Sequence, residues 1–191
     1  YQRQGDPLKL NEFKTACWTL YHLQPKYLLF YNAGPNSGAS AGDTHFPPIF
    51  GVINHWDYDQ VGRIALFPFR HYCIHLRPME LDDTAETRAD YLHRTYTTLL
   101  NEMQTSMTEV IPSLVPDSTG ATNGTESFLS YNFICTEDMM LLVPRRHKES
   151  NGISINSLGF AGLLLAKSPA ELESIQTHGV FQVLADVGYP W

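Results

Sequence analysis

Two apolar segments separated by a short polar turn constrain the fold of this 191-residue chain more than any other feature. Ser127 to Cys135 and Met139 to Val143 each have the length and composition of a strand, and only Thr136, Glu137 and Asp138 lie between them. Two strands joined by so few polar residues predict a β-hairpin, whose strands run antiparallel. We therefore expect an antiparallel sheet.

Helices and further strands surround this hairpin without alternating strictly. Apolar spacing predicts helices over residues 13–21 and from near Asp83 to Met103, and Ser168-Pro169-Ala170-Glu171 forms a capping box whose helix ends at Gly179. Residues 26–31 and 63–76 predict strands, and Pro68 makes the second an edge strand or breaks it in two. This order favours an α+β fold, an antiparallel sheet with flanking helices, in one domain spanning residues 1–191.

The composition excludes several classes of partner. The net charge of −7 argues against a nucleic-acid binder that uses a broad basic surface, while a small anionic ligand stays compatible with it. No apolar run is long enough to cross a membrane, so we expect no membrane partner. Three scattered cysteines signal neither a disulfide framework nor a zinc site, and indicate a reducing, cytoplasmic location.

The segment Asn36–Phe50, NSGASAGDTHFPPIF, carries the candidate chemistry. Its small residues would let backbone N–H groups approach a phosphate, and a neutral imidazole at His45 could attack phosphorus and form a covalent nucleotidyl intermediate. From composition alone, an ordinary glycine- and serine-rich loop with a surface or structural histidine is the commoner arrangement of such residues.

Two blocks of the sequence resemble a known family. YNAGPNSGAS, with His45 five residues later, is similar to the active-site segment of the fungal diadenosine tetraphosphate phosphorylases, also called ATP adenylyltransferases. SYNFICTEDMMLLVPRRHKE and GISINSLGFAGLLLAKSPAEL resemble their second block. The resemblance covers about Asp6 to Gly179 and implies a histidine-triad-like fold within the histidine-triad and galactose-1-phosphate uridylyltransferase superfamily. The upstream part of such enzymes has no counterpart here; we expect it to be a missing N-terminal segment, to lie on a second chain, or to be absent from the protein.

The resemblance also implies roles for individual residues. His45 would be the nucleophile that carries AMP, and a small-molecule nucleotide would be the substrate. The predicted substrate-binding residues are Asn32, Ser37, Gly38, Ala39, Ser40, Asn132, Met140 and Arg145. Bland alternatives stay open for three of them, since Asn132 could pair within the hairpin, Met140 could belong to the core, and Arg145 could lie in a solvated turn.

The centre of the family motif is rewritten in this chain. The family has His-x-His-x-Gln, whereas this sequence has Asp43, Thr44, His45, Phe46 and Pro47. Proline offers no donor to a phosphoryl oxygen, and losing one such donor typically costs about 10²–10³ in rate. Asp43 would repel phosphate, orient His45 as a catalytic partner, or hold a divalent cation that bridges to phosphate.

Three functions follow from these observations. The first is a nucleotidyltransferase that splits diadenosine tetraphosphate with phosphate through an adenylylated His45. The second is a diverged relative that acts on a different, non-nucleotide molecule, with His45 and Asp43 as general acid and base. The third is a non-catalytic nucleotide binder.

Overall fold

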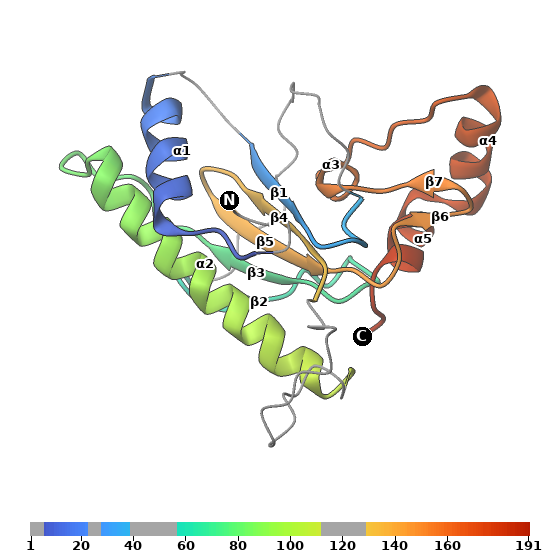
Figure 1. The fold of residues 1–191 in the computed structure, drawn as a ribbon, viewed down its shortest axis with the longest axis horizontal. Coiled ribbons are helices and arrows are strands. Elements are labelled where there is room, and N and C mark those ends of the chain that lie inside the picture. The colour runs from blue at the N-terminus through green and yellow to red at the C-terminus, as the bar shows by residue number, and fades with distance from the viewer. Residues whose placement is uncertain (1–5, 23–27, 39–56, 112–128) are drawn as a thin grey trace.

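The computed structural model describes residues 6–22, 28–38, 57–111 and 129–191, and its fold is α+β, as the sequence predicts (Figure 1). Its helices are α1 (Leu10–His22), α2 (Ala85–Thr108), α3 (Ser157–Phe160), α4 (Pro169–His178) and α5 (Val180–Val187). Its strands are β1 (Leu29–Ala33), β2 (Val61–Gly62), β3 (Tyr72–His75), β4 (Tyr131–Cys135), β5 (Met139–Pro144), β6 (Glu149–Ser150) and β7 (Ile153–Ser154).

The main sheet is antiparallel, with strand order β1-β4-β5-β3-β2. The predicted hairpin is confirmed as β4 and β5, in which Cys135 pairs with Met140. Thr136 closes its turn, because its backbone N–H donates to the Met139 carbonyl oxygen at 2.9 Å and its hydroxyl accepts from the Met139 N–H at 3.2 Å. A second, two-stranded sheet consists of β6 and β7.

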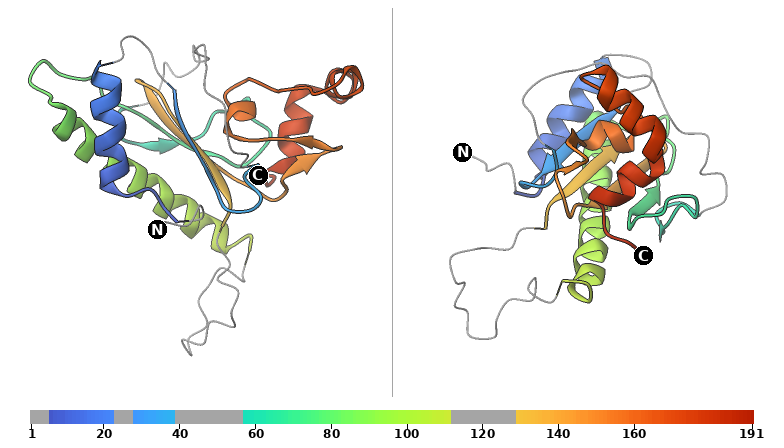
Figure 2. Two further views of the ribbon diagram at one scale, coloured as in Figure 1. Left: turned by 45° about the horizontal axis from the view of Figure 1, so that its top comes forward. Right: turned by 90° about the vertical axis from the view of Figure 1, so that its right-hand side faces the viewer.

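Both faces of the main sheet are covered, so every residue of β4 and β5 is buried. Because side chains alternate along a strand, Tyr131, Phe133 and Cys135 pack in one core with α1 and α2. Ile134, with Leu141 of β5, packs in a second core with α3, α4 and α5. Figures 1 and 2 show the two long N-terminal helices on one side of the sheet and the C-terminal elements on the other.

Helix α2 begins where its sequence predicts and ends later. Thr84 caps it, accepting from the Thr87 N–H at 3.1 Å, and the Thr87 hydroxyl accepts from the Thr84 N–H at 2.9 Å. The helix continues past Met103 to Thr108, because Met107 extends the buried stripe at 0% exposure. Likewise, β1 continues past the predicted end at residue 31, since Asn32 pairs with Asn132 across the sheet.

The strand predicted over residues 63–76 forms only near its end, as β3. Residues 63–71 are not in a strand, because Pro68 has no N–H to offer a ladder, and β2 lies just before the predicted segment. His71 replaces the missing strand pairing, since its Nε2 accepts from the Ile64 N–H at 2.7 Å and its Nδ1 lies 2.7 Å from the Phe69 carbonyl oxygen. Because Nε2 accepts, Nδ1 must carry the proton, which makes the ring neutral.

The capping box of α4 is only half formed. Ser168 accepts from the Glu171 N–H at 3.2 Å, but the Glu171 carboxylate accepts from the N–H of Lys167, one residue before the cap, at 2.6 Å. In the described part of the chain, no helix is long and apolar enough to span a bilayer. Cys17, Cys73 and Cys135 are free and buried.

Candidate functional site

Two asparagines meet across neighbouring strands at the centre of the candidate site. Asn32 of β1 and Asn132 of β4 occupy paired positions of the register. The Asn132 Nδ2 donates to the Asn32 Oδ1 at 2.6 Å and to the Ser37 carbonyl oxygen at 2.9 Å. Alternation turns Asn132 away from the core that α1 and α2 cover, so the pair opens toward the C-terminal elements.

The turn that follows β1 is fixed by its own hydrogen bonds. The backbone N–H and the hydroxyl of Ser37 lie 3.3 and 2.7 Å from the Gly34 carbonyl oxygen, and Ser37 is fully buried. Gly38 has φ +69°, and a Cβ placed there would lie 1.9 Å from the carbonyl oxygen of Ile155. Only glycine therefore fits, and the first predicted block of the site presses directly against the second.

Arg145 ties four segments of the chain together from a position that is 1% exposed. Its Nη1 donates to the Asn132 Oδ1 and to the Ile155 carbonyl oxygen at 2.9 Å, and lies 3.5 Å from the Ser37 carbonyl oxygen. Its other nitrogens donate to backbone carbonyl oxygens of His147, Lys148 and Val187. The guanidinium thus faces carbonyl dipoles, and its predicted contact with phosphate stays a prediction.

No carboxylate pairs with Arg145 among the described residues. Burial alone lowers the pKa of its guanidinium to about 9, which keeps it charged at neutral pH. An uncompensated positive charge therefore lies behind the Ser37–Gly38 turn. That charge favours an anion at the turn, because charges interact more strongly where water is excluded.

Ser157, at the start of α3, is a site residue that the sequence analysis missed. Its backbone N–H donates to the Asn32 Oδ1 at 2.9 Å, and its hydroxyl oxygen lies 2.7 Å from the same atom. The preceding residue, Asn156, caps α3 by accepting from the Leu158 N–H at 2.9 Å. The signal for this contact is weak, since Ser157 lies within the quoted second block without a periodic or charged pattern around it.

The remaining predicted residues are not brought to this cluster by the described structure. Met140 lies at 0% exposure in the core under α1 and α2, on the opposite face of the sheet from Asn132. Four predicted residues lie outside the described part of the chain: Ala39, Ser40, Asp43 and His45.

Alternation along β3 places His71, Cys73 and His75 on one face, a pattern that can hold a metal ion, but these residues do not form a metal site. In the parts of the chain that the structure describes, no three His, Cys, Asp or Glu side chains gather as metal ligands would. Both ring nitrogens of His71 are occupied, and burial lowers its pKa and raises that of Cys73 to about 12, so this thiol stays protonated.

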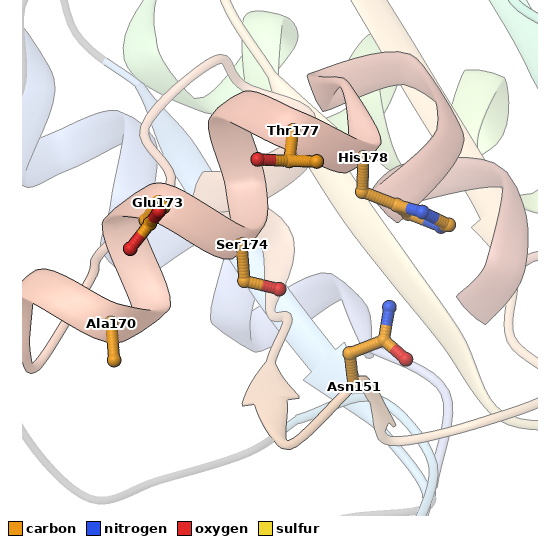
Figure 3. A pocket seen from close by; sticks show the side chains of 6 residues that line it. All are labelled: Asn151, Ala170, Glu173, Ser174, Thr177 and His178. Atoms are coloured by element: carbon orange, nitrogen blue, oxygen red, sulfur yellow. The ribbon is translucent and has the colours of Figure 1, made fainter.

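Two open cavities occur elsewhere on the described surface. One of about 430 Å³ lies between α4 and the β6–β7 turn; its lining is Asn151, Ala170, Glu173, Ser174, Thr177 and His178 (Figure 3). Another of about 350 Å³ lies between α2 and β3, lined by Asp59, Ile74, Arg77, Tyr91, Arg94, Thr95 and Thr98. None of the predicted site residues that the structure describes lines either cavity.

Comparison with known proteins connects this geometry to a family. The profile of the ATP adenylyltransferase C-terminal domain matches residues 65–190. The chain belongs to this family. The match includes Asn132, Arg145 and Ser157, whereas Asn32 and the Ser37–Gly38 turn lie before it.

Relatives of this adenylyltransferase-family chain come from yeast. Over its whole length it is 30% identical to diadenosine 5',5'''-P1,P4-tetraphosphate phosphorylase 2 and 25% identical to Protein APA1, both of Saccharomyces cerevisiae. It covers 63% of each of these relatives.

Solved structures of the yeast Ap4A phosphorylase Apa2 share the fold. The complex with AMP superposes with a TM-score of 0.74 at 27% identity, and the complex with Ap4A with 0.69 at 25% identity. Each comparison covers the whole of this chain and 66% of the solved one. The histidine-triad-like α+β architecture expected from the sequence is thus the architecture of its relatives.

Proposed function

We propose that this chain carries the nucleotidyl-transfer site of a dinucleoside polyphosphate phosphorylase. In the first step an imidazole nitrogen of His45 forms a bond to the α-phosphorus of diadenosine tetraphosphate, and the P–O bond to the leaving ATP breaks. In the second step an oxygen of inorganic phosphate attacks the adenylyl-histidine, which releases ADP and restores the imidazole. The first step breaks one P–O bond and forms one P–N bond, and the second does the reverse, so no oxidant or reductant is needed.

The observation that carries this proposal is the clamp around the Ser37–Gly38 turn. Asn132 and Arg145 both reach the Ser37 carbonyl oxygen, and Gly38 packs against Ile155. A turn held so tightly is preorganised, which lowers the free energy that binding must spend on ordering it. The yeast relative named as a diadenosine tetraphosphate phosphorylase supports the choice of substrate.

We propose two groups of residues in this site, one that shapes the turn and one that carries out the transfer. Asn32, Asn132, Ser37 and Gly38 shape the phosphate-facing turn, and Arg145 positions it from behind. His45 remains the proposed nucleophile, with Asp43 beside it in the sequence and the Ala39–Ser40 backbone nearer the turn. Met140 is left out of the proposed site, because it packs in the opposite core. We propose that the residues of the site belong to a single domain. We also propose that the protein is cytoplasmic, because its three cysteines are free.

A second candidate function rests on Asp43 and Pro47, which stand where the family has His and Gln. Proline removes a donor, and the carboxylate adds a negative charge beside the incoming phosphate. These two changes favour a diverged enzyme for a less charged molecule, in which His45 and Asp43 exchange protons with the substrate.

Intact-protein mass spectrometry separates the two functions. The protein is incubated with diadenosine tetraphosphate without phosphate, beside the His45→Ala variant. The phosphorylase proposal expects a mass gain of one AMP that the variant lacks and that added phosphate removes as ADP. A folded wild-type protein that gains no mass overturns the phosphorylase proposal. A gain seen only after Asp43→His and Pro47→Gln then favours the diverged function, and no gain in either protein leaves the diverged function or non-catalytic nucleotide binding.

A further inference from the structure

Two arginines converge on one exposed tryptophan, and none of the three belongs to the asparagine cluster. The guanidinium carbons of Arg63 and Arg70 lie 5.0 and 5.4 Å from the centroid of the Trp191 ring. Trp191 contacts the start of β3, with its ring centroid 5.6 Å from that of His71 and 6.3 Å from that of Tyr72. In the sheet, β5 lies between β3 and β4, so this cluster and the Asn32–Asn132 pair are built on different strands.

The cluster is held in place by backbone contacts rather than by charge pairing. The Arg70 N–H donates to the Tyr189 carbonyl oxygen at 2.6 Å, and its Nε donates to the Pro190 carbonyl oxygen at 2.7 Å. These bonds hold the Tyr189–Pro190 backbone against Arg70. The two terminal NH₂ groups of Arg70 make no hydrogen bond to the described residues and can donate to a ligand. Trp191 itself is 46% exposed, so the arrangement faces solvent.

The two guanidinium groups of the cluster, those of Arg63 and Arg70, have no acidic side-chain partner in the described part of the chain. Two cations held near one ring repel each other, and a cation over an indole face gains only about 0.5–2 kcal/mol in return. On a chain of net charge −7, such a concentration of positive charge calls for an anion.

We propose that Arg63, Arg70 and Trp191 form a second ligand site, which binds a compact phosphate-bearing anion. A guanidinium fork matches phosphate oxygens with two parallel hydrogen bonds, and two forks beside one ring suit a di- or polyphosphate group. The basic residues form a small cluster rather than a stripe, so a compact anion fits better than an extended polyanion. None of its three residues belongs to the proposed transfer site, and its binding of an anion requires no adenylylation of His45.

Fluorescence of Trp191 reports directly on this site. The chain has three tryptophans, so replacing Trp18 and Trp56 by Phe leaves Trp191 as the single emitter. Pyrophosphate is titrated at constant ionic strength, with sodium chloride in the parallel titration. We expect a saturable change in Trp191 emission with pyrophosphate and none with chloride.

Charge-matched variants decide whether the two arginines are responsible. Arg63→Gln and Arg70→Gln should each raise the apparent dissociation constant about tenfold, the usual loss for one charge-assisted hydrogen-bonding group. Arg94→Gln removes the same charge from an exposed residue whose Nε bonds only to the Asp90 carbonyl oxygen, and should leave the titration unchanged. If Arg70→Gln fails to fold, Arg63→Gln alone carries the comparison.

Several outcomes overturn the proposal. One is a pyrophosphate titration of Arg63→Gln with the same midpoint as the wild type, and another is an equal change in Trp191 emission with chloride. A third is a change in emission with a poly-glutamate peptide but not with pyrophosphate, which would make the cluster a docking surface for acidic protein segments. Adenylylation of His45, measured by mass in the same Arg63→Gln protein, should proceed as in the wild type. Failure of either proposal is therefore visible without the other.

Discussion

A Cβ atom at Gly38 would lie 1.9 Å from the carbonyl oxygen of Ile155, so the turn after β1 and the segment after β7 touch through backbone alone. This contact joins residues more than a hundred positions apart. It explains why a glycine is needed at position 38, whether or not a phosphate is bound.

Substitution Gly38→Ala should therefore be strongly destabilising. The left-handed backbone costs about 1–2 kcal/mol with a Cβ, and displacing a buried carbonyl adds about 1–3 kcal/mol. Gly152→Ala is the matched control, because Gly152 has φ +79° and nothing within 4 Å of an added Cβ. Urea unfolding should show that the loss in free energy of unfolding is larger in Gly38→Ala than in Gly152→Ala, where only the backbone cost applies. Equal losses in the two variants would show that the contact with Ile155 is unimportant.

Arg145→Met should lower the free energy of unfolding by at least about 3 kcal/mol, because it leaves several buried carbonyl oxygens and the Asn132 side chain without a donor. The neighbouring Arg146 is exposed, and Arg146→Ala should change stability by no more than about 0.5 kcal/mol. Chemical denaturation of both variants tests this prediction. Similar unfolding midpoints for the two would mean that the Arg145 guanidinium contributes little to stability.

The elements that the sequence predicts correctly are those that depend on residues close together in the chain. Hydrophobic periodicity predicts α2 and the β4–β5 hairpin, since each depends on neighbours within a few residues. The contact of Ser157 with Asn32 spans 125 positions and leaves no local pattern. Met140 was assigned to the site by resemblance, yet its face follows from the register that pairs it with Cys135, which only the folded sheet reveals.

The sequence also does not reveal which charged residue is buried. Arg145, Arg146, His147 and Lys148 form one polar run in the sequence, and nothing in the run marks Arg145 as the buried member. Its burial depends on four oxygen acceptors from other segments of the chain, which no local propensity encodes; they belong to Ser37, Asn132, Ile155 and Val187.

Tyr72→Phe should leave stability unchanged or raise it by up to about 1 kcal/mol, because the Tyr72 hydroxyl is buried without a hydrogen-bond partner among the described residues. Tyr131→Phe is the contrasting variant. Its hydroxyl lies 2.5 Å from that of Tyr96, and losing this bond should cost about 1 kcal/mol. Thermal unfolding of the two variants compares them, and a large loss in Tyr72→Phe would reveal a partner for this hydroxyl.

Protonation of His71 should make the fold sensitive to mild acid. Its ring is fully buried, and burial lowers the pKa below the ordinary value of 6.5, while Arg63 adds to the lowering. Protonation also forces Nε2 to become a donor, which breaks its bond with the Ile64 N–H. The unfolded chain therefore binds this proton more readily than the folded one.

The sign of the pH effect follows from that difference. The contribution of the neutral ring to stability is fully present above the unfolded pKa near 6.5, and it is lost progressively as the pH falls toward the folded pKa. One such group changes the free energy of unfolding by at most about 1.4 kcal/mol per pH unit. Urea unfolding between pH 8 and pH 5 should show a steeper fall for the wild type than for His71→Gln, which lowers stability at every pH but cannot take up this proton. Parallel curves for the two proteins would show that the folded state accommodates the charged ring, contrary to the hydrogen bonds that hold it.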